Sequence, residues 1–327
     1  AWAVPRGTPR RPRCYGWALM LLDPAALDAS QGLDADVCIV GAGAAGITIA
    51  RVLAAAGIDV LLLEGGSWIP SVRSQELYRA EMVTRYRGER DADTCISNRI
   101  RCFGGTTNHW SGWCRPLEPW DFEARPWVPE SGWPFGLAEL RPFYRRAMPI
   151  LEIDRLEDMD GPAKGAEEGR VFDLGPRFES RTFHFSPPTR FAATYRGELE
   201  AEPRIRLLLE ANVLRLHAAE GLQRVSYADV RVDDGPELQV RAKRWVLASG
   251  GIENARLLLL SDTDARGGLG NGNDLVGRYF MEHPHDGAAG WLVHWEGADS
   301  KAISESYVRR KRVGGMRRMN IWMASEA

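Results

Sequence analysis

The sequence lacks the features that would place the protein in a membrane or on a nucleic acid. No apolar run approaches the roughly 20 residues that a membrane-spanning helix needs. The net charge is only −2, so no overall positive charge attracts nucleic acid or an anionic lipid surface. The basic run Arg309–Arg312 has no interleaved aromatic residues and is typical of a solvated loop. We therefore expect no membrane span and no nucleic-acid partner.

The sequence also lacks the cysteine patterns of disulfide frameworks and zinc sites. The number of cysteines is odd, five, and no C-x-x-C motif occurs. They are Cys14, Cys38, Cys95, Cys102 and Cys114. Cys38 lies within an apolar run, where a free thiol behaves as a small buried apolar group. We expect no metal site and a reducing compartment, which favours a cytoplasmic location over a periplasmic one.

The N-terminal region lacks an initiator methionine and a regular hydrophobic pattern. Residues 1–30 mix arginines with prolines, and their apolar patch, Trp17–Leu22, is short for a signal sequence. We expect residues 1–30 to be a disordered extension, with translation starting at Met20, rather than a targeting signal. At 327 residues the chain is long enough for two domains.

A glycine-rich stretch organises the rest of the chain. The apolar run Asp36–Val40 leads into G-x-G-x-x-G at Gly41–Gly46, and a small-residue helix is predicted over Ile47–Ala56. A second apolar run, Asp59–Leu63, ends at Glu64, which follows the motif by 18 residues. This order of strand, turn, helix, strand and acid is typical of dinucleotide-binding βαβ units.

Each residue type in this unit has a physical role. Gly41 permits a tight turn, Gly43 lets the backbone approach a pyrophosphate closely, and Gly46 lets the helix pack tightly on the strand. The N-terminus of the helix presents free N–H groups and the positive end of its dipole to phosphates. Glu64 can accept hydrogen bonds from ribose hydroxyls. The glycines Gly65 and Gly66 allow a sharp turn beneath the ribose.

The remaining segments complete an α/β pattern, a doubly wound parallel sheet with an antiparallel meander. We predict strands at 205–209, 211–216, 225–232, 238–240 and 244–248, and helices at 75–87, 137–151 and 252–260. The strand at 244–248 runs into Ser249-Gly250-Gly251, so a second unit of strand, glycine turn and helix follows the first. The loop Arg101–Trp113 combines glycines with hydroxyl, amide and imidazole groups, which suits contact with a flat, hydrogen-bonding ring.

Several motifs in this order resemble the glucose–methanol–choline (GMC) family of FAD-dependent oxidoreductases, with the closer likeness to its bacterial sugar and polyol dehydrogenase and pyranose-oxidase-like branches. The matching stretches are Gly41–Gly46 with Glu64–Gly66, Gly104–Trp110, Ala248–Arg256 and Gly277–Pro284. The resemblance implies FAD as the cofactor and hydride transfer from a CH–OH group of an alcohol or sugar to flavin N5. It also implies an electron acceptor, which is oxygen, a quinone or a redox partner.

The resemblance further implies which residues hold FAD. Glu64 would contact the adenosine ribose, and Val213 the adenine through its backbone. The pyrophosphate would lie on Gly41, Gly43 and Gly46. The isoalloxazine ring and its linker would lie along Gly105, Thr106, Asn108 and His109. The full set of expected cofactor-binding residues is Gly41, Gly43, Ala44, Ala45, Gly46, Glu64, Gly65, Gly104, Gly105, Thr106, Asn108, His109, Val213, Ala248, Ser249, Gly250 and His283.

One branch of the family bonds the histidine that corresponds to His109 covalently to the flavin. Asn108 departs from that branch's threonine, which favours a non-covalent contact here. His283 and His285 form H-x-H without further ligands in view, so they are expected to support the flavin end of the pocket rather than a metal.

The resemblance implies an FAD-binding domain formed by residues 31–115 and 200–285, and an α+β substrate domain formed by residues 116–199 and 286–327. The family places its catalytic histidine pair in a late segment, and this sequence ends at Ala327. We therefore expect an incomplete substrate domain and assign no catalytic residue.

Three hypotheses for the function follow. The first is an FAD-dependent oxidoreductase of alcohols or sugars, and the second is a truncated, non-catalytic FAD-binding fragment of such an enzyme. The third is an NAD(P)-dependent dehydrogenase, which does not explain the stretches Gly104–Trp110 and Ala248–Arg256. A flavin absorbance spectrum would separate the first two from the third.

Overall fold

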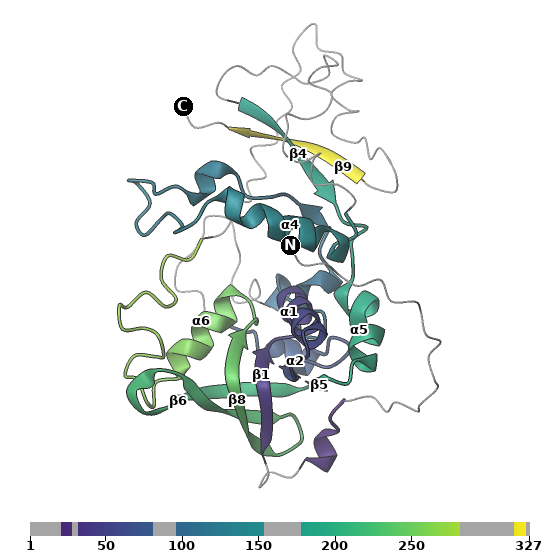
Figure 1. Cartoon of the computed structure of the whole chain (residues 1–327), viewed down its shortest axis with the longest axis vertical. Helices are drawn as coiled ribbons and strands as arrows, with labels where there is room; N and C mark the ends of the chain where they lie inside the picture. Colours follow the sequence, from purple (N-terminus) through teal and green to yellow (C-terminus); the bar gives the residue numbers. More distant parts are fainter. Residues whose placement is uncertain (1–20, 28–31, 81–95, 154–177, 282–316, 325–327) are drawn as a thin grey trace, which may run out of the picture.

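The centre of the molecule is a six-stranded sheet with the order β5-β2-β1-β8-β7-β6 (Figure 1). The structure, a computed structural model, describes residues 21–27, 32–80, 96–153, 178–281 and 317–324. The strands of this sheet are β1 (Leu33–Val40), β2 (Val60–Leu63), β5 (Ile205–Leu208), β6 (Ala211–Ala218), β7 (Val225–Val232) and β8 (Glu237–Leu247). Strands β5, β2, β1 and β8 are parallel, and β7 and β6 continue the sheet in antiparallel fashion. The predicted fold class, a parallel α/β sheet with an antiparallel meander, is confirmed.

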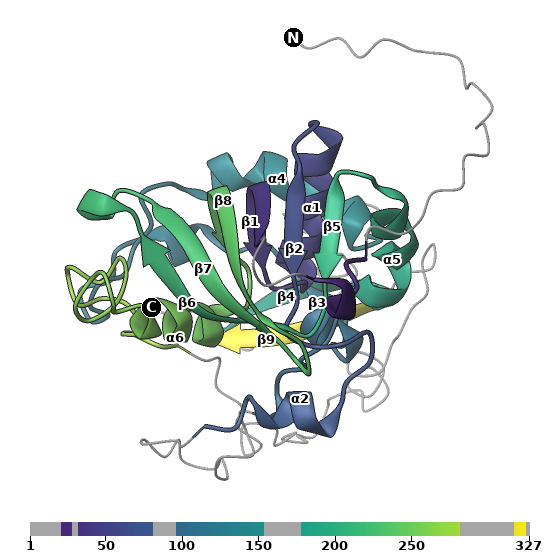
Figure 2. The same ribbon diagram turned by 90° about the horizontal axis from the view of Figure 1, so that it is seen from below.

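The parallel strands pair in register around β1. Val37 of β1 lies opposite Val60 of β2 on one side and Arg244 of β8 on the other. The runs 36–40, 59–64 and 244–248 therefore belong to one parallel sheet, as predicted. Figure 2 shows these strands side by side, with β8, β1, β2 and β5 following one another across the view.

Both faces of the parallel strands are buried, which explains their continuous apolar runs. Alternate side chains pack on opposite faces. Ile39 packs in the cluster that includes residues of α1 (Ala44–Ala55) and α5 (Phe191–Ala201). Cys38 packs in the other cluster, against α6 (Gly251–Leu260) and the antiparallel strands. Burial raises the pKa of the Cys38 thiol far above its usual value, so this thiol is an unreactive apolar group, as predicted.

Strand β8 differs from the prediction of two separate strands at 238–240 and 244–248. The structure has one continuous strand, Glu237–Leu247, whose first half pairs with β7 and whose second half continues along β1. Arg241, Lys243 and Arg244 are polar and suggest a break between two strands. They are instead outward-facing positions of a half-solvated strand, where Lys243 pairs with Asp36 at 2.6 Å.

Two of the four predicted helices agree closely with the structure, and two begin earlier than predicted, since the helix expected at 47–56 is α1, Ala44–Ala55. The helix predicted at 137–151 is α4 (Leu137–Ile150), and the helix predicted at 252–260 is α6. The helix predicted at 75–87 is wrong in its start, because α2 (Val72–Glu76) begins earlier and spans five residues. The Ser71 side chain caps α2 by accepting the N–H group of Ser74 at 3.1 Å. Residues 81–87 lie outside the described part of the chain.

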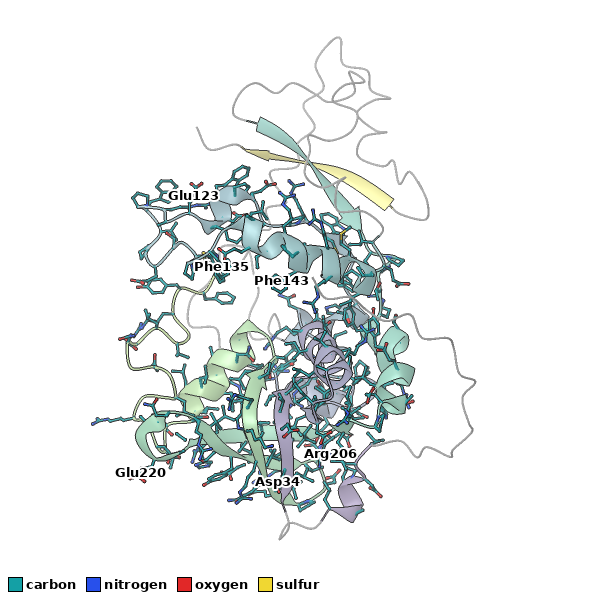
Figure 3. The ribbon with its side chains drawn as sticks, viewed as in Figure 1. Asp34, Glu123, Phe135, Phe143, Arg206 and Glu220 are labelled. Atoms are coloured by element: carbon teal, nitrogen blue, oxygen red, sulfur yellow. The ribbon has the colours of Figure 1, made fainter. Side chains whose placement is uncertain are left out.

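A second, three-stranded sheet consists of β3 (Trp113–Cys114), β4 (Phe178–Phe185) and β9 (Arg317–Ala324), all antiparallel. It lies on the far side of α4 from the six-stranded sheet (Figure 1). The labelled residues Glu123 and Phe143 lie in the α4 layer between the two sheets (Figure 3). Strands β4 and β9 come from the two stretches assigned to a substrate domain, and the boundaries of that domain stay a prediction.

Residues 21–27 were expected to belong to a disordered extension, but the structure packs them on the sheet. Leu21 forms a parallel bridge with Leu207 of β5, and the N–H group of Leu22 donates to the carbonyl of Leu207 at 2.9 Å. Leu22 and Leu27 add apolar contacts to the core on the α6 side of the sheet. These leucines give the segment enough apolar surface to stay on the sheet edge.

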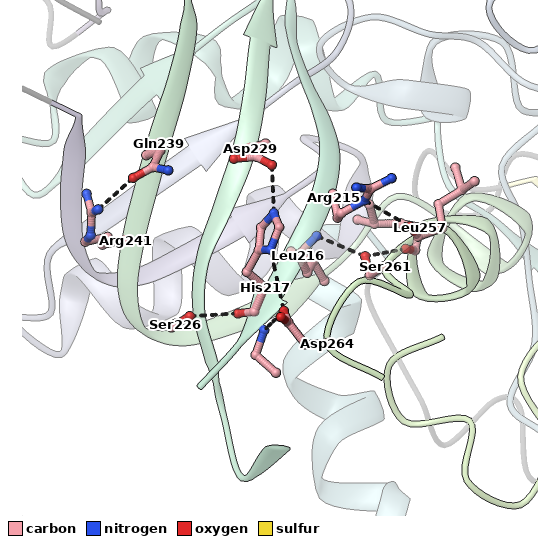
Figure 4. A network of polar contacts seen from close by, with 12 residues as sticks. Arg215, Leu216, His217, Ser226, Asp229, Gln239, Arg241, Leu257, Ser261 and Asp264 are labelled. Atoms are coloured by element: carbon pink, nitrogen blue, oxygen red, sulfur yellow. Dashed lines mark hydrogen bonds and ion pairs between the residues drawn. The ribbon is translucent and has the colours of Figure 1, made fainter. Parts of the chain in front are cut away.

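A network of polar contacts fixes α6 to the edge strand β6 (Figure 4). The N–H group of Leu216 donates to Ser261 Oγ at 2.9 Å, and that hydroxyl donates to the carbonyl of Leu257 at 2.7 Å. The N–H group of Ala218 donates to Asp264 Oδ2 at 2.8 Å. These contacts occupy N–H groups that an open sheet edge would leave without partners.

His217 lies at the centre of the same network. Its Nε2 atom is 2.7 Å from Asp229 Oδ2, and its ring stacks on Tyr227 with 4.3 Å between the ring centroids. Its Nδ1 atom lies 3.5 Å from Oδ2 of Asp264, in the segment that follows α6. His217 thus links β7 to that segment and helps to place α6, whose N-terminus lies at the carboxyl ends of the parallel strands.

We predict that Ser261→Ala destabilises the fold. The change leaves the buried N–H group of Leu216 without its acceptor, and a buried unsatisfied donor costs about 1–3 kcal/mol of unfolding free energy. Urea unfolding followed by circular dichroism measures this loss. The control is Ser226→Ala, which removes only a donor to the carbonyl of His217 and should cost about 0.5–1.5 kcal/mol. Equal stability of Ser261→Ala and the unchanged chain would contradict the role of this contact.

Candidate dinucleotide-binding site

Two units of strand, glycine turn and helix meet at the carboxyl ends of the parallel strands. Strand β1 is followed by α1, and β8 is followed by α6. The N–H group of Gly41 donates to the carbonyl of Leu63 at 2.7 Å, and the N–H group of Ala248 donates to the carbonyl of Val40 at 2.8 Å. Both turns therefore lie at one edge of the sheet, the usual place of ligand sites in open α/β sheets.

Glycine occupies each of the three motif positions of the first turn for a different structural reason. Gly41 has a φ of +102°, and a Cβ atom there would lie 2.7 Å from the carbonyl oxygen of Ala248. A Cβ atom at Gly46 would lie 1.9 Å from the carbonyl oxygen of Gly41. At Gly43, by contrast, a Cβ atom would have no atom of the described residues within 4 Å. The protein itself requires Gly41 and Gly46, whereas the open side of Gly43 is space for a ligand.

The N-termini of α1 and α6 are both open to a ligand. Gly43 precedes α1 and Gly250 precedes α6, and neither helix has a side-chain cap. In the described part of the chain, a Cβ atom at Gly250 or Gly251 would again have no atom within 4 Å. Uncapped N–H groups and the helix dipole favour anions. This arrangement fits the pyrophosphate of a dinucleotide cofactor.

Glu64 lies at the end of β2, buried beside the first turn with 7% of its surface exposed. Its Oε2 atom accepts the N–H group of Ala42 at 2.9 Å, and its Oε1 atom accepts the N–H group of Gly66 at 2.8 Å. Burial raises the pKa of the Glu64 carboxyl, and these two N–H groups and Arg101 act in the opposite direction. A carboxylate has about four lone-pair sites, so Glu64 keeps acceptor capacity for a ribose hydroxyl.

The loop after residue 101 packs directly on the first turn. The N–H group of Gly104 donates to the carbonyl of Ala42 at 2.8 Å, and a Cβ atom at Gly105 would lie 3.2 Å from Gly43 Cα. Phe103 is fully buried and anchors the loop in the core. The loop and the turn therefore form one continuous surface, as the prediction for a ring contact requires.

Within this loop Asn108 has a structural task. Its Nδ2 atom lies 2.9 Å from the carbonyl oxygen of Phe103, 3.0 Å from that of Gly105 and 3.1 Å from Cys102 Sγ. Its amide N–H groups therefore hold the short helix Gly105–Asn108 in shape. Thr106 and His109 are exposed on the outside of this helix, where they are accessible to a cofactor.

The other predicted residues also lie near these turns. The N–H group of Ala211, two residues before Val213, donates to the carbonyl of Glu64 at 2.9 Å, so the start of β6 reaches the end of β2. Ser249 Oγ donates to the carbonyl of Val40 at 3.1 Å. The turn and first residues of α1 carry Ala44 and Ala45. His283 lies outside the described residues, and the binding role of the whole set stays a prediction.

Three residues that shape the site were missed by the sequence analysis. Asn254 accepts the N–H group of Ser249 at 3.0 Å and donates to the carbonyl of Leu247 at 3.1 Å, which fixes the second turn. An asparagine just after a glycine turn is a known capping signal, so Asn254 could have been found. Gln75 and Arg101 bridge segments far apart in the chain, and no local pattern identifies them.

Residues 21–27, 32–80, 96–153, 178–281 and 317–324 contain neither a metal-binding cluster nor a membrane-spanning helix. Within those ranges, no group of three or more histidine, cysteine, aspartate or glutamate side chains is placed to hold a metal ion. No helix there combines the length and the apolar character that crossing a membrane requires.

The fold and this site define a dinucleotide-binding flavoprotein architecture, and comparison with known proteins identifies the family. The model of the family "FAD dependent oxidoreductase" matches residues 36–264. The chain therefore belongs to the FAD-dependent oxidoreductase family, and FAD is the cofactor of that family.

Curated relatives confirm the predicted resemblance to GMC oxidoreductases. An oxidoreductase of Mycobacterium tuberculosis described as GMC-type is 30% identical over 83% of this chain and 46% of its own length. The 6'''-hydroxyparomomycin C oxidase of Streptomyces lividus is 28% identical over 74% of this chain and 53% of its own length. The 2-methyl-1,2-propanediol dehydrogenase of Mycolicibacterium austroafricanum is 26% identical over 76% of this chain and 55% of its own length. The chain thus spans about half the length of these relatives.

We predict that Gly43→Ala and Gly46→Ala separate binding from folding. Gly43 has a φ of −80° and free space around it, so the alanine variant should keep its unfolding free energy. The added methyl group then occupies ligand space, and FAD affinity should fall about tenfold or more. Gly46→Ala forces the backbone apart and should lose both stability and FAD binding. Urea unfolding and quenching of FAD fluorescence measure the two properties. Unchanged FAD affinity in folded Gly43→Ala would place the cofactor elsewhere.

We predict that Glu64→Gln weakens FAD binding. Glutamine has one acceptor oxygen, so its NH2 group must face the N–H group of either Ala42 or Gly66. Loss of a charged hydrogen bond costs about 1.5–3 kcal/mol, which raises the dissociation constant of FAD about tenfold or more. The control is Glu198→Gln on α5, an acid of the Arg51 ion pair. If both variants retain FAD equally after dialysis, Glu64 is not a cofactor contact.

Proposed function

We propose that this protein is an FAD-dependent oxidoreductase that oxidises a CH–OH group of an alcohol or a sugar. The observation that carries the proposal is the convergence of two open glycine turns, at Gly43 and at Gly250, with the loop Gly104–His109. The loop lies on the first turn, and a Cβ atom at Gly43 or Gly250 would have no described atom within 4 Å, which suits an extended cofactor with a pyrophosphate in its middle. The family match over residues 36–264 supports FAD as that cofactor.

The residues of the site have separate tasks in this proposal. The uncapped start of α1 holds the pyrophosphate, and Glu64 accepts the hydroxyls of the adenosine ribose. The backbone of Val213 contacts the adenine. The exposed residues Thr106 and His109 lie along the ring system. Bound FAD supplies a flavin ring that accepts a hydride from the carbon that carries the substrate hydroxyl.

Two relatives support a hydroxyl-bearing substrate. One is named as an oxidase of a hydroxyparomomycin and one as a dehydrogenase of a diol. Because both an oxidase and a dehydrogenase occur among them, we propose oxygen, a quinone or a redox partner as the electron acceptor. We assign FAD binding to residues 31–115 and 200–285 and substrate binding to residues 116–199 and 286–327. The free thiols Cys38, Cys102 and Cys114 support a reducing, cytoplasmic compartment.

A second candidate is an FAD-binding protein that does not turn over as the isolated chain. Hydride transfer needs a base within hydrogen-bond reach of the substrate hydroxyl. In the part of the chain that the structure describes, the loop offers His109, which is exposed and which no side-chain hydrogen bond orients. No residue is therefore assigned as the catalytic base.

One experiment separates the two candidates. The purified chain is saturated with FAD and mixed without oxygen with a panel of primary alcohols, diols and sugars, while the flavin absorbance is followed. Bleaching by a member of the panel supports the oxidoreductase. Bleaching by dithionite alone supports the second candidate, because chemical reduction needs no base. A chain that binds no FAD contradicts both.

We predict that FAD is bound without a covalent link to His109. The loop carries Asn108 in place of the threonine of the covalent branch, and the amide of Asn108 is engaged in shaping the loop. Acid precipitation of the yellow protein should therefore leave the flavin in the supernatant. His109→Ala should give the same partition. Yellow protein in the pellet, turning white in His109→Ala, would show that the link exists.

A further inference from the structure

The guanidinium of Arg101 lies where three segments of the candidate site meet. Its Nη1 atom donates to the carbonyl of Gly65 and, at 3.1 Å, to Ser74 Oγ. Its Nη2 atom donates to Oδ1 of Asn212. Gly65 follows Glu64 at the end of β2, and Asn212 precedes Val213 on β6. One side chain therefore connects the chain neighbours of the two residues expected to contact the ribose and the adenine.

The two glycines after Glu64 make room for this arginine. A Cβ atom at Gly65 would lie 2.2 Å from Nη2 and 2.6 Å from Cζ of Arg101. A Cβ atom at Gly66 would lie 2.3 Å from the Arg101 carbonyl oxygen. Neither Gly65 nor Gly66 has a positive φ. The chain does bend at Gly65 and Gly66, as expected, and the close approach of Arg101 is a second reason for glycine at both positions.

Contacts with α2 and α6 fix the backbone segment that carries Arg101. Gln75 accepts the N–H group of Arg101 at 3.0 Å, and its own amide donates to the carbonyls of Ile96 and Arg99. Arg99 forms an ion pair with Glu253 of α6 at 2.7 Å. The segment that carries Arg101 is thus held by α2 on one side and by α6 on the other.

The charge of Arg101 also acts on Glu64. Burial raises the pKa of the Glu64 carboxyl, and the Arg101 guanidinium opposes this rise together with the N–H groups of Ala42 and Gly66. Each of the three favours the ionised form, which has the greater acceptor capacity. A guanidinium is suited to this position because its planar fork donates in two directions at fixed angles, which a lysine ammonium cannot reproduce.

We propose that Arg101 is a positioning residue for the adenosine diphosphate half of FAD, because it holds the Glu64–Gly65 end of β2 and the Asn212–Val213 start of β6 in one arrangement. The inference rests on the proposed FAD site. Beyond that site, the proposal says that Arg101 itself shapes the nucleotide half. Replacing Arg101 should therefore lower the affinity for ADP alone as well as for FAD.

The test compares Arg101→Met, Arg101→Lys and Asn212→Leu with the unchanged chain. The dissociation constant of FAD is measured by fluorescence quenching and that of ADP by calorimetry. We expect Arg101→Met to weaken FAD and ADP by the same factor, about tenfold or more. Arg101→Lys should recover little of this loss, because lysine keeps the charge but not the fork. Asn212→Leu should weaken both ligands, and the double variant should be no weaker than Arg101→Met alone, since the two residues act as a pair.

The matched control is Arg51→Met. Arg51 also forms an ion pair, with Glu198 at 2.8 Å, and stacks on Tyr195 with 4.2 Å to the ring centroid, and neither partner belongs to the candidate site. Its loss should leave both dissociation constants unchanged, whatever it does to unfolding in urea. If Arg101→Met does not fold, Asn212→Leu alone decides, with a weaker FAD and ADP complex as the expected result.

Three outcomes would overturn the inference. Folded Arg101→Met that binds FAD and ADP as tightly as the unchanged chain removes Arg101 from the site. Full recovery by Arg101→Lys shows that only its charge matters. If Gly43→Ala and Glu64→Gln lose FAD while the Arg101 and Asn212 variants keep it, the proposed FAD site stands without Arg101. An unchanged chain that binds no FAD overturns the site itself, and this inference with it.

Discussion

The structure depends on the close approach of two backbone segments, the first turn of α1 and the glycine turn that follows β1. At Gly46 a Cβ atom would lie 1.9 Å from the carbonyl oxygen of Gly41, so α1 can pack on β1 only when position 46 lacks a side chain. The same turn lies against β8, because a Cβ atom at Gly41 would lie 2.7 Å from the carbonyl oxygen of Ala248. This constraint sets the N-terminus of α1 at the carboxyl edge of the sheet, where its N–H groups are open.

The rest of the molecule keeps that edge intact. The two carboxylate oxygens of Glu64 accept the N–H groups of Ala42 and Gly66. The loop that carries Gly104 packs on the first turn, where the N–H group of Gly104 donates to the carbonyl of Ala42. On the other side, Ser261 attaches the end of α6 to β6, which keeps the second open turn in line with the first. These polar contacts are largely buried, where an unsatisfied group is costly and the arrangement is therefore specific.

The sequence could predict the parts of this arrangement that neighbouring residues encode. The spacing of Gly41, Gly43 and Gly46 between two apolar runs predicts the first unit, and the structure bears it out. Strand β8 was divided in two because polar residues on a half-solvated strand resemble a turn. The pairing of Arg101 with Gly65 joins residues 36 positions apart, and only the folded chain shows that a glycine is needed opposite a guanidinium. A local sequence pattern also could not predict that the Asn108 amide stabilises its own loop, because this role depends on three acceptors that only the folded loop brings together.

The central claim is that the chain binds FAD with its pyrophosphate on the open turn at Gly43. The most direct measurement is a crystal structure of the chain grown with FAD. The account predicts phosphate oxygens within hydrogen-bond distance of the N–H groups at the start of α1, and the adenosine ribose beside Glu64. Electron density for FAD at another part of the surface, or an empty turn in crystals that contain stoichiometric flavin, would contradict it.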